Sequence, residues 1–556
     1  MIAAILGATL WTKWQEDNAP QKINTVTHSS QISQSSVPSA YVPEAPTNTT
    51  ALSTPTPSNN APATFASHAQ AGKTVNVKTD LLNVEISLNG GDIVSTNLLK
   101  YPVSTEQPKT AVSIFNPSQD KLYISQSGLT GSNEVIRYQT NQKNFQLGSN
   151  RQDQVIVVLN GTTRRGLHIE KTYTFTRGSY AIVQQTKVIN RSGKTWRGGI
   201  YNQLVRLNTK QSSSFHTRTY YGGAISTEEK PYEQLSYKNL DKSNVSQNIK
   251  NGWVAMQQPY FLSAWVPNNK QVNHYYSQSV GSGSDGAGNL FTLGYVTPEI
   301  TLKSGSEIKN QSTLYVGPEL KEQLVAVAPH LDLTINYGFL SPISVLLFWV
   351  MTHIYNVIGN WGWTIILVTI FIKAAFYPLS AKSLKSMARM RELQPKFAAL
   401  RERLGDDKQA MGKATMEIYK KEKVNPMGGC LPMIIQIPVF FALYYVLIES
   451  VQFRQAPFMF WVHDLSVKDP FYILPILMGA SMFIQQKMNP PPPDPTQAKV
   501  MMFLPVIFTV FFLSFPAGLV LYWLTNNCVQ SLHQWYVIKT FDPKKEKYKE
   551  RKKKKK

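Results

Sequence analysis

An apolar segment, WGWTIILVTIFIKAAFYPLS, occupies residues 361–380 and carries a single charged residue, Lys373. Its length matches the ~20 residues that an α-helix needs to cross the hydrocarbon core of a bilayer. The polar edge at Lys382 lies nine residues further on. That separation is roughly 13 Å along a helix, about twice the reach of a lysine stem. Because charges inside a membrane usually face a water-filled cavity lined by protein, the segment predicts a span with Lys373 in a hydrophilic cavity.

The C-terminal half contains four further apolar segments, separated by short polar or basic stretches. With the first segment they predict a five-helix core, whose spans are 360–380, 426–449, 471–487, 499–516 and 517–538. The third and fourth have short apolar runs, at 471–484 and 500–515. A short apolar run is accommodated by local thinning of the bilayer, so we expect a thin membrane beside these two spans.

The net charge of +23 is concentrated beside the apolar segments. Residues 382–423 contain twelve Lys or Arg against six Asp or Glu, and residues 539–556 contain eleven against three. Basic clusters next to spans are typical of cytoplasmic loops. This explanation is stronger than nucleic-acid binding, and we expect no specific DNA binding.

The chain before residue 331 is polar and shows the period-two alternation of β-strands, for example in Leu82, Val84, Ile86 and Leu88. We expect a large periplasmic β-sandwich at 73–330, after a disordered Ser/Thr/Pro-rich linker at 15–72 and an N-terminal signal anchor at 1–14, whose start we expect upstream of Met1. Together these features predict a membrane α-helical bundle, with a five-helix core and an N-terminal anchor, that carries a large periplasmic β-sandwich domain.

The remaining segments connect the β-domain and the spans. Residues 331–359 predict an amphipathic helix lying in the outer membrane interface, and its expected lipid-facing residues are Leu340, Ile343, Leu347, Val350 and Ile354. Residues 450–470 and 488–498 predict a periplasmic and a cytoplasmic loop, and 539–556 a basic cytoplasmic tail.

Residues 381–425 predict a cytoplasmic helical hairpin. Pro395 stands at a position favoured in the first turn of a helix, and Phe397, Leu400 and Leu404 follow at heptad-like spacing. Gly405 begins a turn, after which a second arm continues.

The membrane half contains no paired carboxylates, no Ser-His-Asp set, no metal-ligand cluster and no phosphate-binding loop. Both cysteines, Cys430 and Cys528, fall in apolar segments and predict neither a disulfide framework nor a zinc site. The sequence therefore favours a protein that is not an enzyme and has no cofactor or metal.

Several motifs in the C-terminal half resemble the YidC family of membrane insertases in its Gram-negative form. They are Gln394-Pro-Lys396, Arg401-Glu-Arg-Leu-Gly-Asp-Asp-Lys-Gln409, Glu422-Lys-Val-Asn-Pro-Met-Gly-Gly-Cys430, Ile435-Gln-Ile-Pro438, Arg454-Gln-Ala-Pro457, Asp469-Pro470 and Phe515-Pro-Ala-Gly-Leu-Val-Leu-Tyr522. The resemblance is strong from Tyr337 to about Ile538 and covers the β-domain by order and size only.

The resemblance implies an insertase and chaperone of the bacterial inner membrane. Its five helices would enclose a hydrophilic groove with a basic residue, at the position of Lys373, where most relatives are expected to have Arg. The other residues implied to contact a client helix are Thr369, Gln436, Phe440, Met478, Phe511, Tyr522 and Trp523. Implied partners are nascent membrane proteins, the ribosome, the Sec translocon and membrane lipids.

The lysine-rich C-terminus has the composition of a phosphate-binding segment, because it is dense in positive charge and poor in aromatic residues. We expect it to contact the ribosome through Lys544, Lys545, Lys552, Lys553 and Lys554.

Two other classes of protein stay open at this point. A secondary transporter or channel would need a midplane substrate site and usually repeated halves, and no internal repeat is visible. A membrane-anchored polysaccharide-binding protein would leave the charge of Lys373 without a role.

Overall fold

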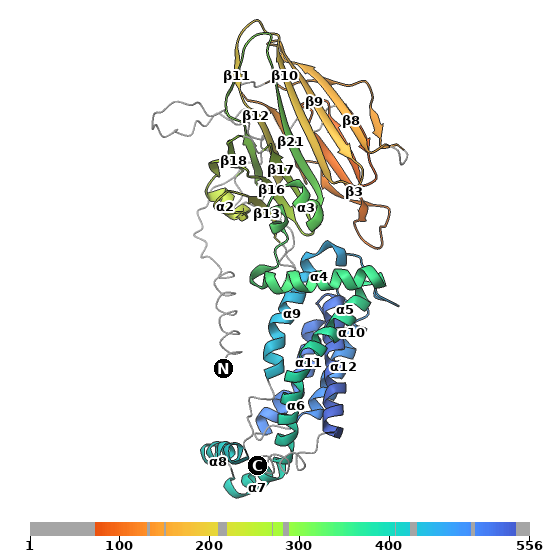
Figure 1. Ribbon diagram of the computed structural model, residues 1–556, viewed down its shortest axis with the longest axis vertical. Helices are drawn as coiled ribbons and strands as arrows, with labels where there is room; N and C mark the ends of the chain where they lie inside the picture. Colours follow the sequence, from red (N-terminus) through yellow and green to blue (C-terminus); the bar gives the residue numbers. More distant parts are fainter. Residues whose placement is uncertain are drawn as a thin grey trace, which may run out of the picture. The chain divides into compact units, whose positions relative to one another are not determined.

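The computed structural model describes residues 73–130, 134–148, 152–209, 220–268, 271–281, 288–405, 407–422, 431–490 and 495–540. The predicted anchor at 1–14, the linker at 15–72 and the five lysines of the predicted ribosome contact lie outside the described residues. The described residues form a β-sheet-rich N-terminal part and a helical C-terminal part (Figure 1).

Two large sheets make up the N-terminal part. The ten-stranded sheet contains, in spatial order, β15 (Ser246–Ile249), β18 (Asn273–Val280), β19 (Leu290–Val296), β12 (Ile200–Leu207), β5 (Tyr123–Leu129), β3 (Ile93–Pro102), β2 (Leu82–Ser87), β1 (Thr74–Lys78) and β7 (Asn144–Gln146), with β4 (Ala111–Phe115) beside β3. The nine-stranded sheet contains β14 (Glu233–Ser236), β13 (Gly222–Ile225), β16 (Val254–Gln258), β17 (Phe261–Pro267), β21 (Glu307–Pro318), β10 (Ala181–Asn190), β9 (Leu167–Thr176), β8 (Gln154–Thr162) and β6 (Tyr138–Gln139). Strands β11 (Trp196–Gly198) and β20 (Ile300–Leu302) form a third, two-stranded sheet.

The strands of the nine-stranded sheet follow the alternation seen in the sequence. Successive residues of β8, β9 and β10 alternate between buried and more exposed positions along their whole length. One face of each strand therefore packs into the core and the other meets solvent, as expected for antiparallel sheets with one wet face. By contrast, β17 and β19 are buried at every residue.

The hydrophobic core lies between the two large sheets and draws large side chains from both, such as Trp265, Tyr295 and Tyr315. Polar side chains cross the core in bonded pairs: Trp265 Nε1 donates to Ser125 Oγ at 3.0 Å, and Tyr295 Oη donates to Ser312 Oγ at 2.7 Å. Hydrogen bonds of this kind offset the free-energy cost of burying polar groups.

The helical part begins after two short helices of the β-sheet part, α2 (Tyr237–Lys242) and α3 (Lys321–Val327), and two 3₁₀ turns at Leu331–Thr334 and Gly338–Leu340. The longer helices are α4 (Ser341–Ile358), α5 (Trp361–Ala375), α6 (Tyr377–Glu392), α7 (Gln394–Leu404), α8 (Lys408–Glu422), α9 (Leu431–Glu449), α10 (Ile473–Met488), α11 (Pro495–Phe512) and α12 (Ala517–Thr540). Helix α12 packs against α5 and α10, and α11 packs against α10.

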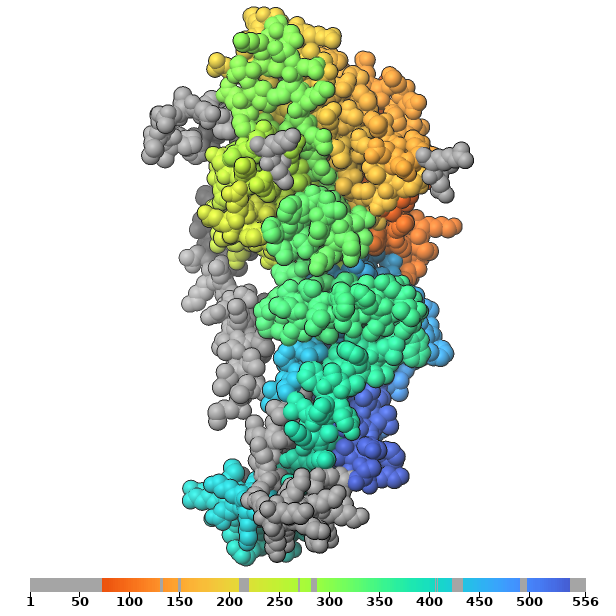
Figure 2. Space-filling view, viewed as in Figure 1, coloured from red at the N-terminus to blue at the C-terminus, as the bar shows by residue number. Residues whose placement is uncertain are grey.

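Helix α4 lies across the direction of the other long helices in Figure 1 and is visible on the face shown in Figure 2. The predicted lipid face was wrong, because Leu340 and Leu347 are buried in the helical core and the other three predicted residues pack against it. The exposed apolar residues are instead Val345, Leu346, Trp349, Val357 and Ile358. The periodicity of α4 identifies its most apolar face, but it does not tell whether protein or lipid covers that face.

By length and apolar composition, one described helix, Gly338–Ile358, is sufficient to cross a membrane. A second candidate is the pair α5 and α6 taken together, although the two helices meet at a bend of 70°. The apolar stretches Ile434–Glu449 and Ala498–Phe512 are shorter.

Helices α7 and α8 pack against each other with a turn at Gly405, which has the positive φ of 55° that favours glycine. Their contact contains Leu393 and Phe397 with Ile418 and Tyr419. The two arms of the predicted hairpin therefore lie side by side, joined by a narrow apolar contact.

Candidate functional site

The backbone turns sharply between α4 and α5, and this turn fixes where α5 begins. Gly359 takes a left-handed conformation, with φ of 71°, and its N–H closes the last turn of α4. Asn360 then caps α5, since its side-chain oxygen accepts a hydrogen bond from Trp363 N at 3.1 Å. The cap and the glycine together set the start of the helix that carries Lys373.

The predicted single span at 360–380 is broken in the structure. Helix α5 ends at Ala375 and α6 begins at Tyr377, with a bend of 70° between them. Pro378 lies in the first turn of α6 and has no N–H to continue the hydrogen bonds of α5. Lys373 thus lies in the last turn of α5, directly before the bend.

A second proline lies on the facing helix. Pro438 is inside α9 and removes one hydrogen bond from its interior. Gln436 lies two residues before this proline, in the same turn of the helix.

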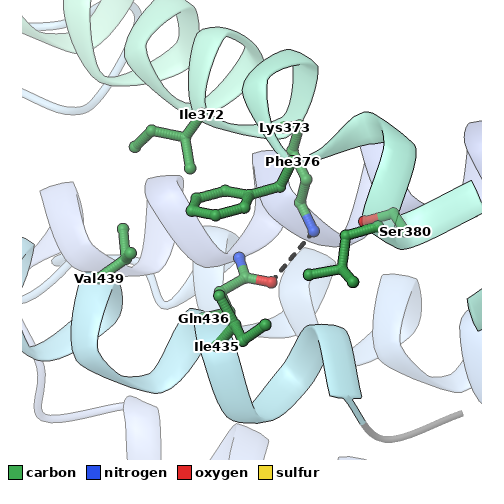
Figure 3. Close-up of a pocket in the computed structure, with 8 residues that line it drawn as sticks. Ile372, Lys373, Phe376, Ser380, Ile435, Gln436 and Val439 are labelled. Carbon is green, nitrogen blue, oxygen red and sulfur yellow. Dashed lines mark hydrogen bonds between the residues drawn. The ribbon is translucent and has the colours of Figure 1, made fainter. Parts of the chain in front are cut away.

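A hollow that is partly open to solvent lies between the broken α5–α6 segment and α9 (Figure 3). Its lining residues are Ile372, Lys373 and Phe376 before the bend, Leu379 and Ser380 after it, and Ile435, Gln436 and Val439 on α9. Because residues on both sides of the bend line the hollow, the bend contributes to its shape.

Lys373 is the charged residue of this hollow, and Figure 3 shows its amine pointing to Gln436. Its Nζ donates to Gln436 Oε1 and to Gln530 Oε1, both at 3.1 Å. Gln436 in turn donates through Nε2 to Tyr522 Oη at 3.3 Å and to Asn526 Oδ1. These contacts connect α5, α9 and α12 through one polar network.

In the part of the chain that the structure describes, the ion pairs do not include Lys373. A lysine ammonium has three hydrogens to donate, and two of them are directed at the glutamine oxygens. The third remains for water or for an incoming acceptor. A carboxylate is the acceptor that would gain most here, because bonds between two charged groups are stronger than bonds to an amide.

Four of the residues predicted to line a groove lie in or beside this network. Gln436 and Tyr522 are hydrogen-bonded members. Phe440 lies one turn beyond Gln436 and packs its ring against Tyr522 and Trp523, at centroid distances of 6.3 and 4.8 Å. Phe512 packs against Phe440 and Trp523 as well, so aromatic rings border the polar network.

Of the eight predicted residues, only Lys373 and Gln436 line the hollow itself. Three others lie neither in its lining nor in the polar network. Thr369 is almost fully buried, and its hydroxyl donates to Ile365 O at 2.6 Å within its own helix. Met478 is fully buried in the helical core. Phe511 is half exposed on α11 and contacts Phe512 and Phe515.

The sequence reasoning missed the other residues that line the hollow, such as Ile372, Phe376, Leu379 and Ser380. The spacing of three from Lys373 was a usable signal for Phe376. Leu379 and Ser380 lie beyond the bend, on α6, so the spacing of a single helix could not place them. Gln530 and Asn526 are polar residues of the last predicted span, but their sequence positions do not distinguish them from the other polar residues nearby.

Comparison with known proteins shows what the chain resembles over its length. The model of the family described as the YidC periplasmic domain matches residues 74–350, and the model described as 60Kd inner membrane protein matches residues 353–546. A relative from Coxiella burnetii strain RSA 331, named membrane protein insertase YidC, is 50% identical over 99% of this chain and 97% of its own. A relative of the same name from Pseudomonas putida strain GB-1 is 43% identical over 97% and 96% of the two chains.

Among solved structures, one described as an active YidC insertase with its first transmembrane domain resolved matches 84% of this chain and 93% of its own. The TM-score is 0.39, with 17% sequence identity.

A β-sheet-rich N-terminal part, followed by apolar helices that enclose a lysine, defines a membrane protein with a polar site among its helices. Near-complete coverage at 50% identity makes the assignment more specific. The chain belongs to the YidC family.

Proposed function

We propose that the protein is a membrane protein insertase, which brings transmembrane helices of client proteins into the bacterial inner membrane and helps them fold. The observation that supports this most is identity of 50% along almost the whole chain to proteins named as insertases. These names do not favour a transporter or channel. The proposed activity is transfer of a client between environments, and it needs no catalysed bond change.

We place the client site at the hollow around Lys373. A translocated segment with an Asp or Glu would meet an ammonium with one unused hydrogen. Two unit charges at ~4 Å attract by about 4 kcal/mol at an effective dielectric constant near 20. This offsets part of the desolvation of one carboxylate without trapping it. The client would therefore be held briefly and then released into lipid.

The aromatic rings beside the network suit the hydrophobic helix that follows such a tail. Phe440, Phe512 and Trp523 would contact its apolar side chains, while Gln436 and Tyr522 would bind its polar groups. Thr369, Met478 and Phe511 stay predicted contacts. Phe511 is half exposed, but Thr369 and Met478 are buried, as are Tyr522 and Phe512, so a client would reach these four only if the helices separated from their arrangement here.

The proposed topology has five spans: the α5–α6 segment, α9, α10, α11 and α12. The β-domain would lie in the periplasm and the α7–α8 hairpin in the cytoplasm, because the segment between the first two spans is strongly basic. Helix α4 would lie in the outer interface, with Trp349 and Leu346 exposed toward lipid. The ribosome, the Sec translocon and membrane lipids are the proposed partners beyond the clients.

Photocrosslinking from within the hollow tests this function. A benzoyl-phenylalanine at Phe376, which lines the hollow, should crosslink to a nascent single-span membrane protein. The same residue at Phe503, which is exposed on α11, serves as the matched control and should crosslink mainly to lipid. Equal client crosslinking from both positions would remove the hollow from the proposal.

A further inference from the structure

A second hollow, shallow and open to solvent, lies where α6, α10 and α12 come together, apart from the hollow of Lys373. Leu384, Met387 and Arg391 of α6 form one side. Met488, at the end of α10, and Ile538 of α12 form the other. None of the residues that line this second hollow belongs to the client site proposed above.

The amide nitrogen of Gln534, a polar side chain that lines this hollow, is already hydrogen-bonded. Gln534, which is 3% exposed, donates through Nε2 to Met488 O at 3.1 Å and to Asn489 Oδ1 at 3.0 Å. The side chains left to face an occupant are therefore mostly apolar, with the guanidinium of Arg391 as the charged exception. Apolar walls with one cation favour an amphiphile with an anionic group over water or a simple ion.

The surroundings indicate that the hollow lies at the depth of lipid headgroups. Lys487 lies over the ring of Phe483, with Nζ 4.8 Å from its centroid, and Lys539 lies over Trp535 at 5.1 Å. Lysines whose stems lie along apolar residues, and tryptophans beside them, are typical of the membrane interface. Each pair is next to a lining residue of the hollow, Met488 and Ile538 respectively.

The charge around the hollow is strongly positive. In the described residues of α6, α10, α11 and α12, one acidic residue, Glu392, stands against seven basic ones. The basic residues are Lys382, Lys385, Arg389, Arg391, Lys487, Lys499 and Lys539. Basic pockets between helices on the cytoplasmic side suit anionic lipid headgroups.

We propose that this hollow binds one anionic phospholipid. Its phosphate would lie against Arg391, and the first part of an acyl chain would lie against Met387, Met488 and Ile538. The guanidinium is suited to phosphate because its planar set of donors can bind two oxygens together. The bound lipid would fill the junction between α6, which follows the bend, and α10 and α12.

Photoaffinity labelling of the full-length protein in vesicles tests the site. A phosphatidylglycerol analogue with a diazirine near the glycerol should label peptides that contain Met387 and Met488 several-fold more than the matching phosphatidylcholine analogue. Arg391→Gln should abolish this preference. Ala388→Trp, which fills the hollow, should abolish labelling by both analogues.

Arg403→Gln, on α7, is the matched control, because it removes the same charge from an exposed position that does not line the hollow. It should leave the preference intact. Equal labelling by the two analogues in the unchanged protein would overturn the proposal, as would labelling that Arg391→Gln leaves unchanged. Suppression of labelling by inorganic phosphate alone would also overturn it, since the site would then bind a free anion.

Discussion

Glu319 is a carboxyl group enclosed by the β-sheet part of the protein. Its side chain is 4% exposed and accepts a hydrogen bond from Gln257 Nε2 at 3.0 Å. Burial raises the pKa of Glu319 from 4.5 to about 8, and the bond from Gln257 opposes the rise. The folded state therefore holds this proton more tightly than the unfolded state does.

Glu319→Gln should stabilise the protein at neutral and mildly alkaline pH. With the folded pKa raised to about 8, the contribution of Glu319 to stability is present at acid pH and is lost as the pH rises toward that value. Glutamine has no such dependence. Its advantage should therefore grow, by at most about 1.4 kcal/mol per pH unit, when denaturant unfolding is followed from about pH 5 to about pH 8.

Glu322→Gln is the control for this experiment, because Glu322 lies on the exposed side of α3 and loses the same charge. It should leave the pH dependence unchanged. The same pH dependence in the unchanged protein and in Glu319→Gln would contradict the assigned burial effect.

At the residue scale, the chemistry of the site was easier to predict than its members. Lys373 stood out because a charge in an apolar segment is rare. Gln436 and Tyr522 lie in its polar network, and their contact with a client stays a prediction. Thr369 could not be judged, because a threonine in a helix can bond its own backbone, and it does so here. Met478 and Phe511 are apolar residues whose facing direction depends on how neighbouring helices pack.

Helices α10 and α11 are in close contact at Gly479. A Cβ added to Gly479 would clash with Thr509 Oγ1, so the threonine side chain or the two helices must shift to accommodate a larger residue. Gly479→Ala should therefore destabilise the protein by about 1–3 kcal/mol, the usual cost of overpacking. Thermal unfolding in detergent measures the effect.

Thr509→Ala should rescue part of that loss, because it removes the atom that the new methyl group meets. The double variant should be more stable than Gly479→Ala alone. If the stability losses of Gly479→Ala and Thr509→Ala simply add in the double variant, the contact between the two residues is not the cause of the destabilisation.

The α7–α8 hairpin should be needed for insertion while contributing little to the fold of the remaining helices. Its apolar contact is internal, between residues such as Phe397 and Tyr419, and Lys396 pairs with Glu422 across the two arms. Replacing Pro395–Lys420 by a short Gly/Ser linker should preserve the unfolding temperature and reduce insertion of client proteins into vesicles. Normal insertion by this variant would leave the hairpin without the proposed role.

At the element scale, the strands and helices follow patterns that the sequence displays. The alternation along β8, β9 and β10 and the proline at the start of α7 are examples. The bend at Phe376 was not predicted, although Pro378 was visible, because a proline near the end of an apolar segment also fits a helix that continues. The side of α4 that contacts protein is set by its packing against α5 and α9. The periodicity of α4 contains no information on where those two helices lie.

At the scale of the whole molecule, the distribution of charge predicts a contact between the C-terminal tail and the ribosome. The C-terminal segment after Phe541 is dense in lysine. Removing it should weaken binding of the detergent-solubilised protein to ribosomes, and binding of the full chain should fall steeply as salt rises, since phosphate contacts release counterions. Equal ribosome affinity of the full and truncated chains would point instead to lipid headgroups as the partner of the tail.

The division of the chain into a β-sheet-rich part and a helical part was predictable, because polar alternation and long apolar segments differ so strongly in composition. The number of helices that cross the membrane depends on the bilayer as well as on the chain. Short helices such as α10 would rely on local thinning of the bilayer, which no property of the sequence alone fixes.

The proposed role of Lys373 depends on its charge, and substitutions that separate charge from size test it most directly. The measurement is protease protection of the translocated tail of a single-span client in vesicles, with each variant present at equal level. Lys373→Arg should retain protection, whereas Lys373→Met and Lys373→Glu should reduce it, most strongly for clients with Asp or Glu in the tail. Lys487→Met is the control, because Lys487 is exposed and does not line the hollow around Lys373, and this variant should retain protection. Full protection of acidic tails by Lys373→Met would contradict an electrostatic role.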